Sequence, residues 1–430
     1  MIIFHFSNSF EEFEVLKLVD LCATFREMIF DDKSKETKGF ISEFFFKKKM
    51  EEQLFSACEK GNVEEVKKLL HNNNKTLDIN WQDNLGQTPF YIACSKGYFD
   101  IVKELLNDSR VDVNKVNNDG TTPFHFSCRN GSIEIVKLLL NDQKVDIVKS
   151  NKHEATPFYI ACQEGHLEIV KMLLNDKRVN INQPNKNGAT PFYIACSKGH
   201  IEIVKILLND EKVEINQGKN NGQTPFYIAC HNGHIEVVKL LLNDTRVEIS
   251  KEENSLGATP FYIACSVGRT EIVELLLTEK RVDINQSNKN GTTPFYIACS
   301  KGQTEVVKLL LKDERVEINK TKNNIFPPFF VACQNGHIEV VKLLANDQRI
   351  DINQVETEYK KTPFYIACKN GHTEVVKFLL NDKRINLDQT RDNGKTPFWV
   401  SYKEGQTEVT NVLRNESFFF FLFSPYLLSY

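Results

Sequence analysis

The sequence predicts an all-α repeat solenoid of helix-turn-helix units with projecting β-hairpin arms. The string Phe-Tyr-Ile-Ala-Cys occurs seven times without change, and Thr-Pro precedes it at steps of 34 residues, stretched twice to 35. A fixed period of this size is typical of stacked repeat arrays, in which each unit contacts only its neighbours. Pro327-Pro328 replaces one Thr-Pro pair, and the others begin at Thr88, Thr122, Thr156, Thr190, Thr224, Thr259, Thr293, Thr362 and Thr396.

The first element of each unit is predicted to be a short helix. In the unit that starts at Gly188, Thr190 is a suitable N-cap and Pro191 stands at the first helical position, where a missing N–H has no cost. The apolar residues 192–196 supply a buried face, and Gly199 can end the helix in the left-handed conformation.

A second, longer helix is predicted to open at His200. Its apolar residues recur at three- and four-residue spacing through Leu208, and Glu202 can pair with Lys205 on the exposed side. Residues 213–216 then alternate like a short extended arm, and Asn221-Gly222 is expected to turn back into the next Thr-Pro. No unit can bury its apolar face alone, so neighbouring units must do so.

These residues resemble the ankyrin repeat, whose Thr-Pro-Leu-His-x-Ala helix opening and Gly-His-x-Glu-Ile-Val-Lys-Leu-Leu-Leu second helix are similar to residues 190–208. The resemblance covers residues 52–415, about eleven units. A tetratricopeptide array shares the 34-residue period but lacks the Thr-Pro, Gly and Asn-Gly pattern. Two features depart from the family: Tyr replaces the usual His in seven units, and the step after helix two is one residue longer, with Asn175 able to serve as a left-handed cap.

We expect three parts along the chain: an N-terminal helical cap or extension at 1–50, the repeat solenoid at 51–415, and an apolar tail at 416–430. Within the first part, residues 10–30 are expected to form an amphipathic helix and 31–39 a charged linker. The N-terminal segment could instead dock a partner or lie on a membrane surface. The tail is too short to cross a bilayer, so packing over the last unit, an interfacial anchor and a poorly ordered end are the alternatives.

The composition excludes several function classes. The net charge of −3, from 54 basic and 57 acidic residues, gives no reason to expect nucleic acid as a partner. Ten of the eleven cysteines hold the same position in successive units, too far apart for disulfides, which favours buried thiols in a reducing compartment. Because residues 1–6 also lack the basic region of a secretory signal, we expect a cytoplasmic protein.

The sequence contains no recognisable catalytic or metal-binding motif, so we expect no enzyme activity, no cofactor and no metal. The recurring histidines stand at the start of the second helices, where a structural role is expected. The tyrosines at the family's His position are expected to form a structural ladder, with hydroxyls bonding near the Thr-Pro turns.

The resemblance implies a protein-binding surface formed by the concave face of the first helices and by the arm tips. The positions that vary after each repeat cysteine and the irregular arms are therefore the candidates, although a solvated helix face or packing onto a neighbouring arm would explain them equally well. The candidate protein-binding residues are Trp81, Leu85, Lys96, Arg129, Lys198, His231, Lys301, Ile325, Phe326, Tyr359 and Lys369.

The function expected from this pattern is a non-catalytic scaffold that binds another protein. A membrane-associated adaptor, anchored by the apolar tail, is the alternative, and self-association through the aromatic ends is a third. The sequence does not identify the partner, because one repeat scaffold can accept many partners by changing surface residues.

Overall fold

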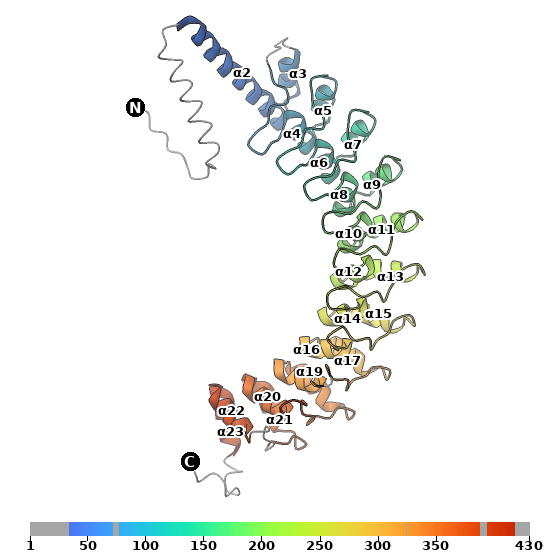
Figure 1. Ribbon diagram of the computed structural model, residues 1–430, viewed down its shortest axis with the longest axis vertical. Coiled ribbons are helices and arrows are strands. Elements are labelled where there is room, and N and C mark those ends of the chain that lie inside the picture. The colour runs from blue at the N-terminus through green and yellow to red at the C-terminus, as the bar shows by residue number, and fades with distance from the viewer. Residues whose placement is uncertain (1–33, 72–76, 324, 388–393, 418–430) are drawn as a thin grey trace. The chain divides into compact units, whose positions relative to one another are not determined.

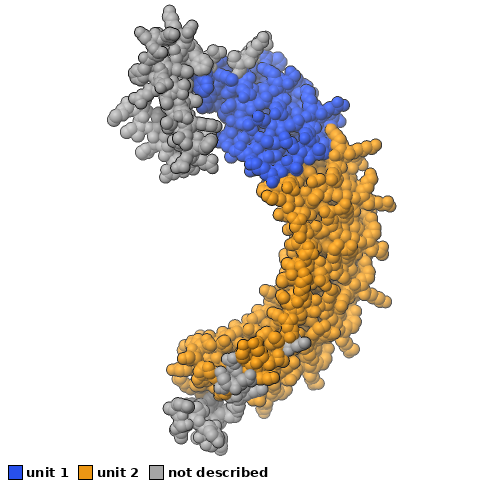
Figure 2. All heavy atoms as spheres, viewed as in Figure 1, with its two compact units in different colours: residues 1–152 blue, residues 153–430 orange. Residues whose placement is uncertain are grey.

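The computed structural model describes residues 34–71, 77–323, 325–387 and 394–417. The chain forms two compact units, residues 1–152 and 153–430, which Figure 2 shows in blue and orange. Within each unit, successive pairs of helices stack side by side (Figure 1). The described residues form 22 helices.

The helices of the first unit are α2 Ser34–Lys60, α3 Val63–His71, α4 Pro89–Lys96, α5 Phe99–Leu106, α6 Pro123–Arg129 and α7 Ile133–Leu140. The helices of the second unit are α8 Pro157–Glu164, α9 Leu167–Leu174, α10 Pro191–Lys198, α11 Ile201–Leu208, α12 Pro225–Asn232, α13 Ile235–Leu242, α14 Pro260–Val267, α15 Thr270–Leu277, α16 Pro294–Lys301, α17 Thr304–Leu311, α18 Pro328–Asn335, α19 Ile338–Asn346, α20 Pro363–Asn370, α21 Thr373–Leu380, α22 Pro397–Lys403 and α23 Thr407–Ser417. From α4 onward, the even-numbered members are called first helices and the odd-numbered members second helices.

The first helices start and end as predicted. The hydroxyl of Thr190 accepts the backbone N–H of Tyr193 at 3.1 Å, and Pro191 follows at the first helical position. Gly199 has φ 75° and donates its N–H to the carbonyls of Ala195 and Cys196. The short Thr-Pro…Gly pattern is therefore sufficient to define this helix, because both ends are fixed by local bonds.

Two expectations about the second helix are wrong. Helix α11 has 8 residues, the same length as α10, so it is not the longer one. Asn175 has φ −82° and ψ −9°, which is right-handed, so it is not a left-handed cap. The chain leaves helix α9 through a turn at Asp176, whose carboxylate accepts the backbone N–H of Arg178 at 3.0 Å.

The segments that link one helix pair to the next are built of successive turns. In one such loop, Gly222 donates its N–H to Lys219 at 2.8 Å, and Lys219 donates to Gln223 at 3.0 Å. Adjacent loops are joined by a bond from the Asn220 N–H to the Asn187 carbonyl at 3.0 Å. Over the described residues the structure has one isolated bridge, between Lys322 and Phe326, and no longer strand, so the predicted hairpin arms are not confirmed.

The core lies between the stacked helices. Helix α10 packs between α8 and α12, with Phe192 1% exposed and Ala195 and Cys196 fully buried. Small side chains at these two positions allow the first helices to approach closely, and each buried Phe contributes about 1.5–3 kcal/mol. The ten described cysteines are buried and unpaired, and burial raises the pKa of the Cys58 thiol to about 12.

A helix occupies the described part of the predicted charged linker. Helix α2 is continuous from Ser34 to Lys60, so residues 34–39 are helical rather than a linker, and a boundary at residue 50 would fall inside this helix. Its C-terminal half packs on α3 and α4. The predicted amphipathic helix at 10–30 lies outside the described residues.

The last described pair of helices carries a more polar core than the others. Ser401 and Thr410 stand where most other repeats have Ala and Val, and their hydroxyls are 3.0 Å apart. Tyr402 takes the position of the repeat cysteine and is 69% exposed. Residues 418–430 of the predicted tail lie outside the described residues. In the part of the chain that the structure describes, every helix is too short or too polar to span a membrane.

Candidate protein-interaction surface

A row of half-buried isoleucines runs along the first helices of the second unit. Each isoleucine packs against one of two clusters of buried Tyr and Ala side chains, the first of which includes Tyr159 and Tyr193 and the second Tyr227 and Tyr262. At the same repeat position farther along the chain, Val331 and Ile366 are each only 5% exposed. The row therefore forms an aliphatic surface over five consecutive repeats: Ile160, Ile194, Ile228, Ile263 and Ile297.

The tyrosine row beneath it is structural. Tyr159 is 4% exposed, and its hydroxyl accepts a hydrogen bond from the Asn185 side chain at 3.0 Å. Tyr91 has the same relationship with Asn117 at 2.9 Å. These asparagines stand five residues before the next Thr-Pro, so the predicted ladder near the turns is confirmed. Burial raises the pKa of Tyr159 to about 12.

The histidines at the start of the second helices also fasten neighbouring repeats together. His234 Nε2 lies 2.8 Å from the carbonyl oxygen of Ser197, which also accepts a bond from the Asn232 side chain at 2.8 Å. Where the histidine is absent, Gln303 donates to the Ser266 carbonyl at 3.0 Å. The structural role expected for these histidines is therefore confirmed, and the asparagines at the variable position also hold the array together.

The predicted binding residues at the ends of the first helices differ in their surroundings. Arg129 lies over the Phe126 ring at 5.6 Å, and His231 Nδ1 lies 2.8 Å from the Asn232 side-chain oxygen. Lys369 is 3.9 Å from Glu404. Three lysines are exposed, and within the described residues their side chains make neither a hydrogen bond nor an ion pair: Lys96, Lys198 and Lys301.

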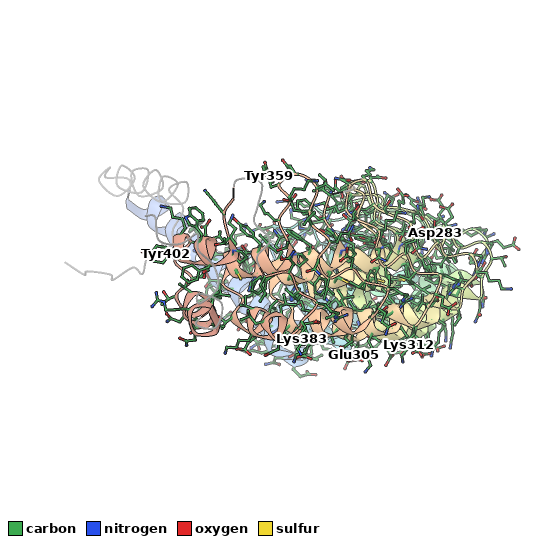
Figure 3. All side chains as sticks on the ribbon, turned by 90° about the horizontal axis from the view of Figure 1, so that it is seen from below. Asp283, Glu305, Lys312, Tyr359, Lys383 and Tyr402 are labelled. Carbon is green, nitrogen blue, oxygen red and sulfur yellow. The ribbon has the colours of Figure 1, made fainter. Side chains whose placement is uncertain are left out.

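The predicted residues on the loops fall into two groups. Trp81 is half-buried, with its ring edge-on to Phe55 at 5.7 Å, and the half-buried Phe326 ring lies 5.7 Å from Phe330. Both aromatics therefore pack on neighbouring helices. Leu85 is 61% exposed, Tyr359 is 40% exposed, and Ile325 is half-buried. Tyr359 points outward from the loop side of the array (Figure 3).

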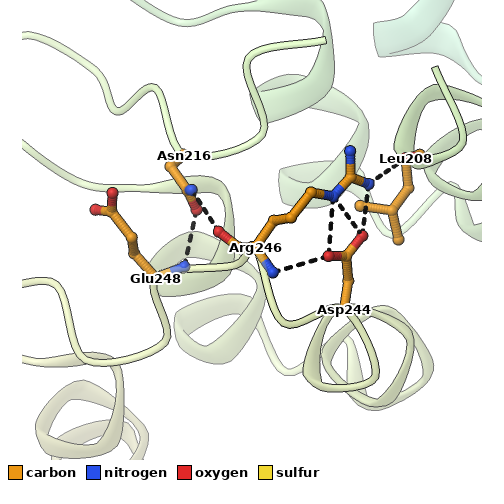
Figure 4. Close-up of polar contacts among 5 residues, drawn as sticks. All are labelled: Leu208, Asn216, Asp244, Arg246 and Glu248. Atoms are coloured by element: carbon orange, nitrogen blue, oxygen red, sulfur yellow. Dashed lines mark hydrogen bonds and ion pairs between the residues drawn. The ribbon is translucent and has the colours of Figure 1, made fainter. Parts of the chain in front are cut away.

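Sequence reasoning missed an arginine that closes the preceding repeat. Arg246 binds the Asp244 carboxylate, with an Nη2–Oδ2 distance of 2.6 Å, and its Nη2 also donates to the carbonyl of Leu208 at 2.7 Å (Figure 4). Leu208 is the last residue of α11, so the cation lies at the negative end of that helix dipole. The pairing with Arg246 lowers the pKa of the Asp244 carboxyl. The Asp-x-Arg spacing is the signal that could have revealed this contact.

An asparagine ladder was missed as well. Asn216 donates to the carbonyl of Arg246 at 2.7 Å and accepts the N–H of Glu248 at 2.9 Å (Figure 4). One side-chain amide thus satisfies two backbone groups of the next repeat. The same pair of bonds recurs at Asn80, Asn114, Asn182, Asn285 and Asn353.

The family model described as ankyrin repeats in three copies matches the chain over residues 54–151, 96–185, 144–219, 211–288, 247–324, 280–355 and 329–419. The chain therefore belongs to the ankyrin-repeat family, as the sequence predicts. Ankyrin repeats generally mediate protein–protein interactions and are in general non-catalytic modules. No curated protein matched the chain significantly.

Proposed function

We propose that the chain is a non-catalytic scaffold that binds another protein on the face formed by its first helices. The half-buried isoleucine row carries this proposal. The isoleucines hold the same position in five consecutive repeats, so they form a stripe and not scattered apolar residues, and apolar patches on a surface typically mark interaction sites.

The charge beside this row suggests the chemistry of the partner. Lys198 and Lys301 are exposed at the ends of α10 and α16 and have no partner within the described residues. A partner segment with aliphatic side chains and nearby carboxylates would satisfy both features. The exposed loop residues Leu85 and Tyr359 remain candidates for additional contacts. The half-buried residues Ile325, Trp81 and Phe326 are candidates through the part of each side chain that solvent reaches.

The place of action proposed for the protein is the cytoplasm. Ten unpaired cysteines support this proposal, because reducing compartments keep thiols free. The adaptor alternative depends on residues 418–430, and no described residue favours it.

Affinity capture with quantitative mass spectrometry tests the proposal. The bait is the full chain, compared with an Ile194→Asp, Ile228→Asp double variant in which two half-buried members of the row become charged. The control is Lys239→Glu on a second helix, an exposed position outside the row. We expect one or more proteins to be captured by the wild type and the control but lost from the double variant.

Circular dichroism must show that both variants keep the helical content of the wild type. Equal recovery of the same proteins by the wild type and the folded double variant would reject the isoleucine row as the binding surface.

A further inference from the structure

The last first helix, α22, has one uncovered side. Each earlier first helix of the second unit packs between two others, as α20 does between α18 and α22. Helix α22 packs on α20, and in the described part of the chain no first helix follows it. Its outer side is therefore the end of the helix stack (Figure 1).

Three aromatic side chains of α22 are accessible at positions that are buried in the preceding repeat. Trp399 is 38% exposed and Tyr402 is 69% exposed (Figure 3), whereas Tyr365 and Cys368 at the same positions of α20 are buried. Phe398 is half-buried, and the equivalent Phe of α20 is also buried. We call these three residues the open face: Phe398, Trp399 and Tyr402.

The composition of the open face is the opposite of what contact with water favours. Terminal repeats of a solenoid need a polar outer face to stay soluble. Here Trp399 replaces the Tyr of other repeats and Tyr402 replaces their Cys, so both accessible positions carry a larger aromatic ring. Lys395 Nζ lies 4.1 Å from the centroid of the Trp399 ring, and this is a polar cover for one ring only. Large aromatic groups stabilise a protein when they are buried, so the open face is suited to being covered.

The chain that follows α23 has matching chemistry. Residues 418–430 contain no charged residue, and residues 418–423 are Phe-Phe-Phe-Phe-Leu-Phe. Such a segment gains free energy when its apolar surface leaves water. The open face has aromatic surface to bury against it, and neither side requires a charged partner.

The position at which this segment begins also suits the open face. Helices α22 and α23 are joined by a short turn at residues 404–406, so the end of α23 returns toward the start of α22. Helix α22 has 7 residues and therefore rises about 10 Å. Residues 418–423 span about 20 Å when fully extended, so they are long enough to cross the open face.

We propose that residues 418–423 fold back over the open face and bury Trp399 and Tyr402. A segment of the same chain has an effective concentration in the millimolar range at this face, so it is favoured over a second copy or another protein. The inference is independent of the proposed function, because none of the five isoleucines of the row lies on α22.

Tryptophan fluorescence of the full chain tests the proposal. The chain has two tryptophans, so Trp81→Phe leaves Trp399 as the only one. In this background we compare the native tail with Phe419→Asp, Phe420→Asp, in buffer without lipid or detergent. Because the charged tail would leave the open face, acrylamide should quench Trp399 severalfold more strongly in that variant, and the emission should shift to longer wavelength.

The control adds the same two charges nearby without changing the tail. Asn411→Asp, Asn415→Asp alters two exposed residues of α23 and should leave the quenching at the level found with the native tail. Circular dichroism must show equal helical content in all the variants.

A second measurement reads the other end of the open face. Tyr402→Cys introduces the residue type that most other repeats have at this position, so the fold should be kept. The ten described cysteines are buried, and Cys22→Ser removes the remaining one. The thiol introduced at position 402 should react with a thiol reagent severalfold more slowly beside the native tail than beside the tail with Phe419→Asp, Phe420→Asp.

Two outcomes would overturn the proposal. One is equal quenching and equal thiol reactivity with the native and the charged tail. The other is protection of Trp399 that appears only as the protein concentration is raised, which would assign the open face to a second copy of the chain.

Discussion

The side-chain amide of Asn216 donates to the backbone carbonyl of Arg246 at 2.7 Å, across the boundary between two repeats. The same asparagine accepts the N–H of Glu248 at 2.9 Å, so one side chain takes the place of a pair of backbone bonds. The cohesion of the array therefore depends on polar groups at its edge as well as on its apolar core.

Replacing Asn216 with alanine should destabilise the second unit by about 1–3 kcal/mol, because two hydrogen bonds of about 0.5–1.5 kcal/mol each are lost. Urea unfolding followed by circular dichroism measures the change. Ser250, which holds the equivalent position in the next repeat, makes one bond, to the Arg281 carbonyl at 3.0 Å. Ser250→Asn should therefore add about 0.5–1.5 kcal/mol, and an equal loss from both variants would contradict this account.

Lys360→Gly should stabilise the chain by about 1 kcal/mol, because Lys360 has φ 55° and glycine adopts this left-handed conformation without the steric cost of a Cβ. The matched control is Gly188→Ala, whose Cβ would clash with the side chain of Asn220 and lie 2.8 Å from its backbone nitrogen. This control should lower the melting temperature. Calorimetry on both variants provides the comparison, and a destabilised Lys360→Gly variant would disagree with the observed φ.

The free energy of unfolding should fall as the pH rises above about 8.5, which is the ordinary pKa of a cysteine thiol. Burial raises the pKa of Cys58, Tyr159, Tyr227 and Tyr262 to about 12. Because their folded pKa values exceed the unfolded ones, these groups stabilise the fold fully at lower pH. That contribution is lost as the pH rises through the folded pKa.

For each tyrosine the shift from about 10 to about 12 corresponds to a loss of about 2–3 kcal/mol above pH 12. Urea titrations at several pH values measure the slope. The Tyr159→Phe variant should show a shallower slope than the wild type. A free energy of unfolding that stays constant up to about pH 11 would be inconsistent with this burial.

Trp81→Ala should reduce stability by about 1–3 kcal/mol, because the indole packs edge-on against Phe55 of α2. Thermal unfolding followed by circular dichroism measures the change, and a nearest-neighbour repeat model gives its size, because long repeat arrays need not unfold in two states. Leu85→Ala, which alters a side chain that is 61% exposed, is the control and should change stability by less than about 0.5 kcal/mol. Equal effects from the two variants would show that Trp81 does not support the N-terminal repeat.

The local elements of each repeat could be predicted from the sequence because their causes are local. Thr190 caps a helix that starts one residue later, and Gly199 ends it. The hydrogen bonds between repeats could not be predicted from the sequence. Asn216 and Arg246 are far apart in the chain, and neither residue type indicates its partner. The sequence shows that these asparagines and arginines recur with the repeat, but it does not show which backbone groups they bind.

The candidate surface was predicted less well for a related reason. Ile194 and Ile366 occupy the same repeat position, yet one is half-buried and the other is 5% exposed. The difference depends on what the neighbouring repeat places above each side chain. Similarly, Trp81 was expected on an exposed arm, but it packs on a ring from a helix that precedes it in the chain.

The contact between Arg246 and the Leu208 carbonyl has a consequence for the order in which the repeats are completed during synthesis. In five second helices, α11, α13, α15, α17 and α19, the C-terminal end accepts a hydrogen bond from an arginine of the following repeat. On a ribosome the earlier repeat emerges first and waits with an open helix end until about 38 more residues have been added. Assembly from the N-terminus therefore proceeds with an unfinished edge that only the next repeat can close.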